Sequence, residues 1–128
     1  MSLIDRPAVE LLRLLQAGEV SSAELTQAFL DRIDQHDDRV GAFLHVDGSA
    51  AMRRAEEIDS RRQQGEALGA LAGLPVAVKD VLCDRSTPTT CASRMLEQFR
   101  PPYDATVVAR LKTADAVLLG RTNMDEFA

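Results

Sequence analysis

Apolar residues near the amino terminus recur with the period of an α-helix. From position 8 they return at intervals of three and four residues, so they share one helical face, and Gly18 supplies a natural stop. The apolar positions are Ala8, Leu11, Leu12 and Leu15. A second helix should begin directly afterwards, because Ser21 and Glu24 have the spacing of a capping box. Its apolar positions are Leu25, Ala28, Phe29 and Ile33. The pattern therefore predicts a helical segment over about residues 5–36.

Three short apolar runs have the length and composition of β-strands. The run 40–46 is β-branched at both ends and precedes the turn pair Asp47 and Gly48. The run 75–78, PVAV, lacks polar alternation, which predicts a strand buried on both faces. The run 116–119 is followed by Gly120, where we expect the third strand to end. Helices that alternate with buried strands indicate an α/β fold.

A third helix is expected between the first two strands, with a narrow apolar stripe of Ala51, Ala55 and Ile58. Its other positions carry a charge run that is most simply a solvated face. The charged residues are Arg53, Arg54, Glu56, Glu57, Arg61 and Arg62. A fourth helix should follow Asp104 as its N-cap and carry Val107, Val108 and Leu111.

Residues 83–102 are rich in turn formers and hydroxyl groups and predict an ordered loop with one helical turn. The hydroxyl residues are Ser86, Thr87, Thr89, Thr90 and Ser93. Such a cluster either binds a substrate or satisfies the backbone groups of the turns, and the second role is the commoner one. Cys91 fits a buried structural cysteine better than a nucleophile, because no histidine lies in its loop. Asp125 and Glu126 are adjacent and should diverge rather than form a shared carboxylate pair.

Composition narrows the classes of function. The chain has 128 residues, 45% hydrophobic and 27% charged, as expected for part or all of one globular domain. A net charge of -5 without a basic cluster argues against direct binding of nucleic acid. Apolar runs are too short to cross a bilayer, and the start is unlike a secretory signal, so we expect a cytoplasmic protein without a membrane partner. Two cysteines and two histidines give no metal-binding spacing.

Lys79 stands at the carboxyl end of the run 75–78, where α/β sheets place their ligand crevices. A buried lysine loses the solvation of its charged form and can then act as a neutral general base. The alternative is an exposed strand-end lysine that reaches water, balanced by Asp80, and most lysines are of this kind. The residues alone leave both interpretations open.

Three stretches together resemble the amidase signature family: GLPVAVKD at 73–80, TTCASRMLEQFRPPYDATVVARL at 89–111 and AVLLGRTNMDEFA at 116–128. The resemblance extends from Leu3 to Ala128. It implies a mixed β-sheet covered by helices on both faces, of which these residues form the amino-terminal portion of a single domain, with an incomplete sheet. The division would be a helical segment at about 5–36 and an α/β portion at about 40–128.

The resemblance also implies catalysis by a serine, a cis-serine and a lysine. Lys79 matches the lysine, which takes a proton from the bridging serine. The two serines belong to a Gly/Ser-rich signature expected downstream of Ala128, so we expect these residues alone to be inactive. Weaker transfers make Thr89, Thr90 and Ser93 a supporting shell. They also make Thr122, Asn123, Met124 and Ala128 lining residues of the cleft. No metal is implied.

Within the family, the chain is most similar to the amidase subunits (the A subunits) of tRNA-dependent amidotransferases acting on Glu-tRNA(Gln) or Asp-tRNA(Asn). That resemblance implies glutamine as the source of ammonia and subunits B and C as partners. It places ATP, magnesium and the tRNA on the B subunit, with no cofactor in this chain. Two alternatives remain: a stand-alone amidase acting on another carboxamide, and a non-catalytic fragment that binds a partner protein.

Two positions depart from the family pattern. Asp115 stands where a glycine is usual at the end of a helix, and Ser86 replaces a common turn glycine. Glycine adopts positive φ without steric cost, whereas aspartate reaches that region at some cost. We therefore expect a locally altered or strained turn at each position.

Overall fold

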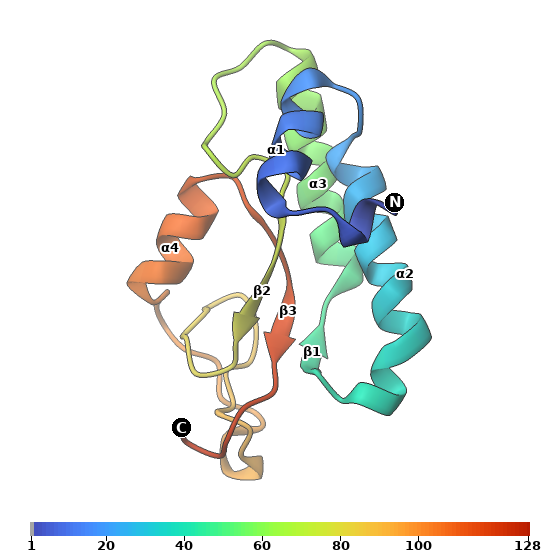
Figure 1. The fold of residues 1–128 in the computed structure, drawn as a ribbon. Helices are drawn as coiled ribbons and strands as arrows, with labels where there is room; N and C mark the ends of the chain where they lie inside the picture. Colours follow the sequence, from blue (N-terminus) through green and yellow to red (C-terminus); the bar gives the residue numbers. More distant parts are fainter. Residues whose placement is uncertain (1) are drawn as a thin grey trace.

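A computed structural model describes residues 2–128 as an open sheet with helices packed around it (Figure 1). The elements in chain order are η1 (Leu3–Asp5), α1 (Ala8–Ala17), α2 (Ser22–Val40), β1 (Phe43–Val46), α3 (Gly48–Gln63), β2 (Pro75–Lys79), η2 (Arg94–Leu96), α4 (Thr106–Thr113) and β3 (Val117–Thr122). The strand order is β1-β3-β2, with β1 antiparallel and β2 parallel to β3. The sheet is therefore mixed, and the α/β expectation is confirmed.

Local signals in the amino-terminal helices produce the expected ends. Gly18 closes α1 in the left-handed region at φ 70°. At the start of α2, the Ser21 side chain accepts from the Glu24 amide and the Glu24 carboxylate accepts from the Ser21 amide, so the capping box is present. Asp59 of α3 accepts hydrogen bonds from two further amides of that first turn, at Ser22 and Ala23. The two helices are thereby fixed to each other.

Two apolar clusters hold the helices against the sheet. One joins α2 and α3 to β3, and it includes Leu30, Ala51, Ala55, Ile58, Val117 and Leu119. The other joins α1 and the start of α2 to the approach to β2, and it includes Leu11, Leu15, Val20, Leu25 and Leu74. Helices α2 and α3 cover one side of the sheet, while α4 lies on the other side (Figure 1). The apolar stripe expected on α3 is thus confirmed.

The first strand begins later than expected. Residues up to Val40 continue α2, and Gly41 ends that helix at φ 65°. The Asp37 carboxylate then accepts hydrogen bonds from the amides of Ala42 and Phe43, which fixes the turn into the strand. The prediction of a strand from position 40 was wrong because β-branching at Val40 was outweighed by this cap.

Strand β2 forms as predicted, but its burial does not. It lies at an edge of the three-stranded sheet, and only Val78 is buried, whereas Ala77 and Lys79 are exposed. The expectation of a strand buried on both faces is therefore wrong for residues 75–78. An apolar run in an edge strand carries no signal that separates it from a central strand.

Gly120 lies inside β3 rather than at its end. The register against β2 shifts by one residue there, since Val76 pairs with Leu118 and Ala77 pairs with Gly120. A Cβ at position 120 would lie 2.4 Å from the carbonyl oxygen of His45 in β1. The glycine thus permits a close approach of two strands at a bulge, which explains why the prediction of a stop was wrong.

Helix α4 begins at Thr106 without a side-chain cap, so the predicted role of Asp104 was wrong. The Asp104 carboxylate instead accepts hydrogen bonds from the Arg85 amide at 2.9 Å and from Lys112 Nζ at 3.0 Å. Of the apolar residues expected to pack, Val108 is buried and Val107 is half exposed.

The charged face of α3 is not simply solvated, because two of its arginines converge on Asp115. Asp115 has φ 62°, which confirms the strained turn expected there. Its carboxylate accepts hydrogen bonds from Arg54 and Arg61 at 2.8 Å and from the Gly69 amide at 2.7 Å. These bonds offset the conformational cost that a glycine would avoid. The Arg61 hydrogen bond, with those of the Gly69 amide and the nearby Arg54 charge, lowers the pKa of Asp115.

Candidate functional site

Lys79 is the last residue of β2 and pairs in register with Thr122 of β3. Its side chain is exposed, and Nζ donates a 2.6 Å hydrogen bond to the carbonyl oxygen of Asn123. The two strands are parallel, so both carboxyl ends open at the same edge of the sheet. Residues 2–128 therefore place the amine at a strand end, as the sequence suggested, but they do not bury it.

The amine faces a hollow of about 560 Å³ formed by the strand end and the carboxyl-terminal residues. The lining residues are Lys79, Val81, Asn123, Met124, Asp125 and Ala128. Three of the four predicted cleft residues, Asn123, Met124 and Ala128, thus lie beside Lys79. Thr122 contacts Lys79 through the strand pairing instead of lining the hollow. The sequence analysis missed Val81 and Asp125, although their positions next to two aligned strand ends were a usable signal.

The three hydroxyl residues proposed as a supporting shell contact the neighbours of Lys79. The amide and the hydroxyl of Thr90 donate to the Asp80 carboxylate, the amide at 3.1 Å. Thr89 is buried, and its hydroxyl oxygen accepts from Arg121 at 3.2 Å and from the Asp84 amide at 3.3 Å. Ser93 donates to the Glu126 carboxylate at 2.8 Å. Any support that they give Lys79 therefore passes through these residues.

A buried ion pair beneath Lys79 went unrecognised in the sequence. Asp80 and Arg121 are 1% and 2% exposed, and Arg121 Nε donates to Asp80 Oδ1 at 3.0 Å. Arg121 Nη2 also donates to the carbonyl oxygen of Leu82 and to the hydroxyl of Thr89. The signal available was an aspartate directly after one strand run and an arginine directly after another, because parallel strand ends adjoin.

The loop beside this pair has an unusual backbone. Cys91 and Ala92 have φ of 50° and 56°, a region that residues with a Cβ rarely occupy. The Cys91 amide donates to the carbonyl oxygen of Asp80, and the Cys91 carbonyl accepts from the Phe127 amide at 3.0 Å. In Figure 1 the loop and the carboxyl-terminal tail lie together beyond the ends of β2 and β3. Cys91 is only partly buried, so its predicted full burial was wrong, while at Ser86 φ is not positive.

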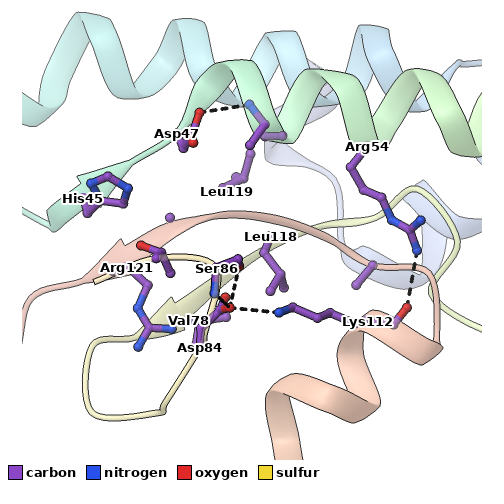
Figure 2. Close-up of a pocket in the computed structure, with 15 residues that line it drawn as sticks. His45, Asp47, Arg54, Val78, Asp84, Ser86, Lys112, Leu118, Leu119 and Arg121 are labelled. Atoms are coloured by element: carbon purple, nitrogen blue, oxygen red, sulfur yellow. Dashed lines mark hydrogen bonds and ion pairs between the residues drawn. The ribbon is translucent and has the colours of Figure 1, made fainter. Parts of the chain in front are cut away.

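A separate cavity of about 460 Å³ lies between α3, the sheet and the loop that follows β2 (Figure 2). Its polar rim includes Asp84, which accepts from Lys112 Nζ at 2.8 Å and from the Ser86 amide at 3.0 Å. Burial would raise the pKa of Asp84, but the hydrogen bonds from Lys112 and Ser86 outweigh it, and the net pKa is lowered. Lys79 does not line this cavity, so it is not the opening that the amine faces.

Neither a metal-binding cluster nor a membrane-spanning helix occurs within the described part of the chain. Among residues 2–128, no three His, Cys, Asp or Glu side chains are grouped so that they could hold a metal ion. In the same range, no helix has both the length and the apolar character that a membrane span requires.

Comparison with known proteins gives consistent matches. The family model described as Amidase matches residues 24–128. The A subunit of glutamyl-tRNA(Gln) amidotransferase from Salinispora tropica is 59% identical over 121 residues, which are 94% of this chain and 25% of that protein. The protein of the same name from Rhodopirellula baltica is 54% identical over 121 residues, covering 94% and 24%. The chain thus spans about a quarter of the length of these curated relatives.

Solved structures agree in fold. The native peptide amidase from Stenotrophomonas maltophilia superposes with a TM-score of 0.88 at 38% identity, covering 94% of this chain and 25% of that one. A bacterial aryl acylamidase belonging to the amidase signature enzymes gives a TM-score of 0.86 at 29% identity, covering 92% and 25%. The order of elements in residues 2–128 is thus shared with enzymes that differ in the amides named for them.

Proposed function

Because the chain belongs to the amidase family, we propose that its residues carry the lysine end of an amide-hydrolysing site, with Lys79 as the terminal base. The observation that supports this proposal is the position of Lys79. Its amine stands at the aligned ends of β2 and β3 and faces a hollow lined by residues of the 123–128 segment. The crevice at the carboxyl ends of strands is the usual place for a ligand in α/β proteins.

In the proposed reaction, Lys79 takes a proton from a bridging serine, which in turn takes one from a nucleophilic serine. The resulting oxygen attacks the carboxamide carbon, ammonia leaves, and water releases the acid from the acyl-enzyme. Neither serine is assigned within residues 2–128. The exposure of Lys79 there means that the desolvation favouring a neutral amine has to come from the groups that cover the hollow when the site is assembled.

The proposed substrate is glutamine, and the proposed role is to supply ammonia for the amidation of Glu-tRNA(Gln) or Asp-tRNA(Asn) in the cytoplasm. The name shared by the relatives, which are up to 60% identical, supports this assignment. On this proposal the chain acts with subunits B and C, and ATP, magnesium and tRNA bind to the B subunit. A net charge of -5 agrees with tRNA being held elsewhere.

A stand-alone amidase is the second candidate, favoured by the structural similarity to peptide amidase and aryl acylamidase. The two candidates differ in the amide that they hydrolyse. A chimaera separates them: this chain replaces the corresponding quarter of the Salinispora tropica relative, assembled with its subunits B and C. We expect ammonia release from glutamine at a rate within about tenfold of the parent complex, and little from an aryl acylamide or a peptide amide. The reverse preference would reject the glutamine assignment.

The same reasoning predicts that the 128-residue polypeptide alone does not hydrolyse glutamine, because it offers a base without an assigned nucleophile. Ammonia release from the purified polypeptide is the measurement, and its Lys79→Ala variant is the control. Release above that control would show that a hydroxyl within the polypeptide serves as nucleophile and would overturn the proposed division of the site.

A further inference from the structure

The buried pair of Asp80 and Arg121 contacts every segment around Lys79. The Asp80 amide donates to the carbonyl oxygen of Thr122, and its carbonyl oxygen accepts from Cys91. Its carboxylate accepts from Arg121 through one oxygen and from Thr90 through the other. Asp80 follows Lys79 directly in the chain, so both the backbone and the side chain of this neighbour are fixed. The position of Lys79 therefore depends on Asp80.

The bulge at Gly120 directs Arg121 to this place. Leu119 packs in the cluster beneath α3, and strict alternation along the strand would send Arg121 to the same side. The register shift at Gly120 reverses this order. In Figure 2, Leu119 lies on the α3 side of β3, while Leu118 and Arg121 lie on the other side. The bulge and the ion pair thus form one device, because the guanidinium reaches Asp80 only through the extra residue.

Stability alone is a poor explanation for this arrangement. Well-packed apolar residues often replace a buried ion pair without loss of stability, since desolvation offsets the Coulombic attraction. Within residues 2–128, the buried Nη1 of Arg121 also has no hydrogen-bond partner, which adds a cost. The arginine is useful in another way, because its fork joins three points at once: Asp80, Leu82 and Thr89. A planar fork with several partners fixes geometry better than apolar contact does.

We infer that Asp80 and Arg121 are positioning residues, which hold Lys79 and the left-handed turn at Cys91 and Ala92 in one fixed relation at the end of the sheet. This inference rests on the proposed function of Lys79 as a base. Neither residue touches substrate in this scheme. Arg121 holds the Asp80 carboxylate, Asp80 holds Thr90 and Cys91, and the strand end then presents the amine in one direction.

The first test measures the hold on the loop in the 128-residue chain by amide hydrogen exchange. In Arg121→Met the Asp80 carboxylate loses its partner, and the Thr90 amide that donates to it should exchange at least about tenfold faster. The matched control is Asp115→Asn, which breaks the other arginine pairs. It should speed exchange at the Gly69 amide and leave Thr90 within about twofold. Unchanged exchange of Thr90 in Arg121→Met would overturn the inference.

The second test measures turnover in the chimaera with the Salinispora tropica relative. A misplaced base slows the chemical step without weakening substrate binding, so kcat in Arg121→Met should fall about 100-fold with KM within about threefold. Arg121→Lys keeps the charge but not the fork, and it should recover part of kcat. It also serves if the methionine variant does not fold. Asp115→Asn should stay within about threefold of the parent chimaera in kcat. Equal losses of kcat in Arg121→Met and Asp115→Asn would reduce the pair to a structural role and contradict the inference.

Failure of the proposed function gives a different result. If Lys79→Ala in the chimaera keeps the parent kcat, Lys79 is not the base and the proposed function is rejected. The Thr90 exchange result is independent of turnover, so it still decides whether Arg121 holds the loop beside residue 79.

Discussion

The two ends of β3 each carry an aspartate paired with arginine, but in opposite settings. Before the strand, Asp115 meets Arg54 and Arg61 at the surface, where these arginine side chains remain 30% and 26% exposed. After the bulge, Arg121 meets Asp80 in the interior, and both are almost completely buried. Each pair lies beside left-handed backbone, at Asp115 itself in the first case and at Cys91 and Ala92 in the second.

The difference shows what each pair can accomplish. Asp115 offsets the cost of its own positive φ with bonds to solvated arginines, so its removal leaves charges that water can take up. Asp80 and Arg121 have no such recourse, and they tie together the residues around Lys79. One pair therefore stabilises a turn locally, whereas the other fixes a functional end of the sheet.

The largest stability effect should come from breaking the interior pair. Arg121→Met leaves the Asp80 carboxylate buried without its partner, and we expect the free energy of unfolding to fall by about 3–5 kcal/mol. Urea denaturation followed by circular dichroism measures it. The double variant Asp80→Asn, Arg121→Met removes both charges and should lose less than the sum of the two single variants. Additive losses would show that the two side chains act independently.

Gly120→Ala should disturb the bulge that joins the two ends. The new Cβ would meet the His45 carbonyl oxygen, a backbone atom that cannot turn aside, so we expect a loss of about 1–3 kcal/mol and faster exchange of the Thr90 amide. Gly48→Ala is the matched control, because its Cβ would meet only the Leu30 side chain, at 3.5 Å. Equal stability of the two variants in urea would remove the bulge from the account.

Asp115→Asn should cost less than the interior variants, about 1–2 kcal/mol, because its arginines keep water and other carboxylate partners. Those partners are Glu57 for Arg54 and Glu66 for Arg61. Asn also tolerates positive φ, so the turn should persist. Thermal unfolding measures the difference. A loss as large as that of Arg121→Met would contradict the contrast between the two ends.

The smallest effect is a dependence of stability on pH. The pKa values of Asp115 and Asp84 are lowered in the folded chain, so their contribution is complete above the ordinary aspartate pKa of about 3.9 and disappears as pH falls through the lowered values. Stability should therefore decline from about pH 5 downward. Urea denaturation between pH 6 and pH 2 measures the slope, which Asp115→Asn should make shallower. An unchanged slope in that variant would contradict the assignment.

Local signals predicted much of the fold. The capping box at Ser21, the stop at Gly18 and the apolar stripe of α3 were all readable, since each depends on residues close in sequence. Burial of β2 and the bulge at Gly120 were not, because both depend on which strand lies alongside.

At the candidate site, the strand-end place of Lys79 was predictable from the run before it. The Asp80–Arg121 pair was not recognised, because its members are 41 positions apart and meet only when β2 and β3 align. The Asp104 cap failed for a similar reason, since Lys112 and the Arg85 amide take up its carboxylate.

The central claim is that Lys79 is the base of an amide-hydrolysing site, and the chain offers a sharp control because Lys79 and Lys112 are its only lysines. The decisive measurement is kcat for ammonia release from glutamine by the chimaera with either lysine replaced by alanine. Lys79→Ala should lower kcat by at least about 1,000-fold, whereas Lys112→Ala, which breaks ion pairs with Asp84 and Asp104, should stay within about threefold once folded. Equal turnover in the two folded variants would contradict the account.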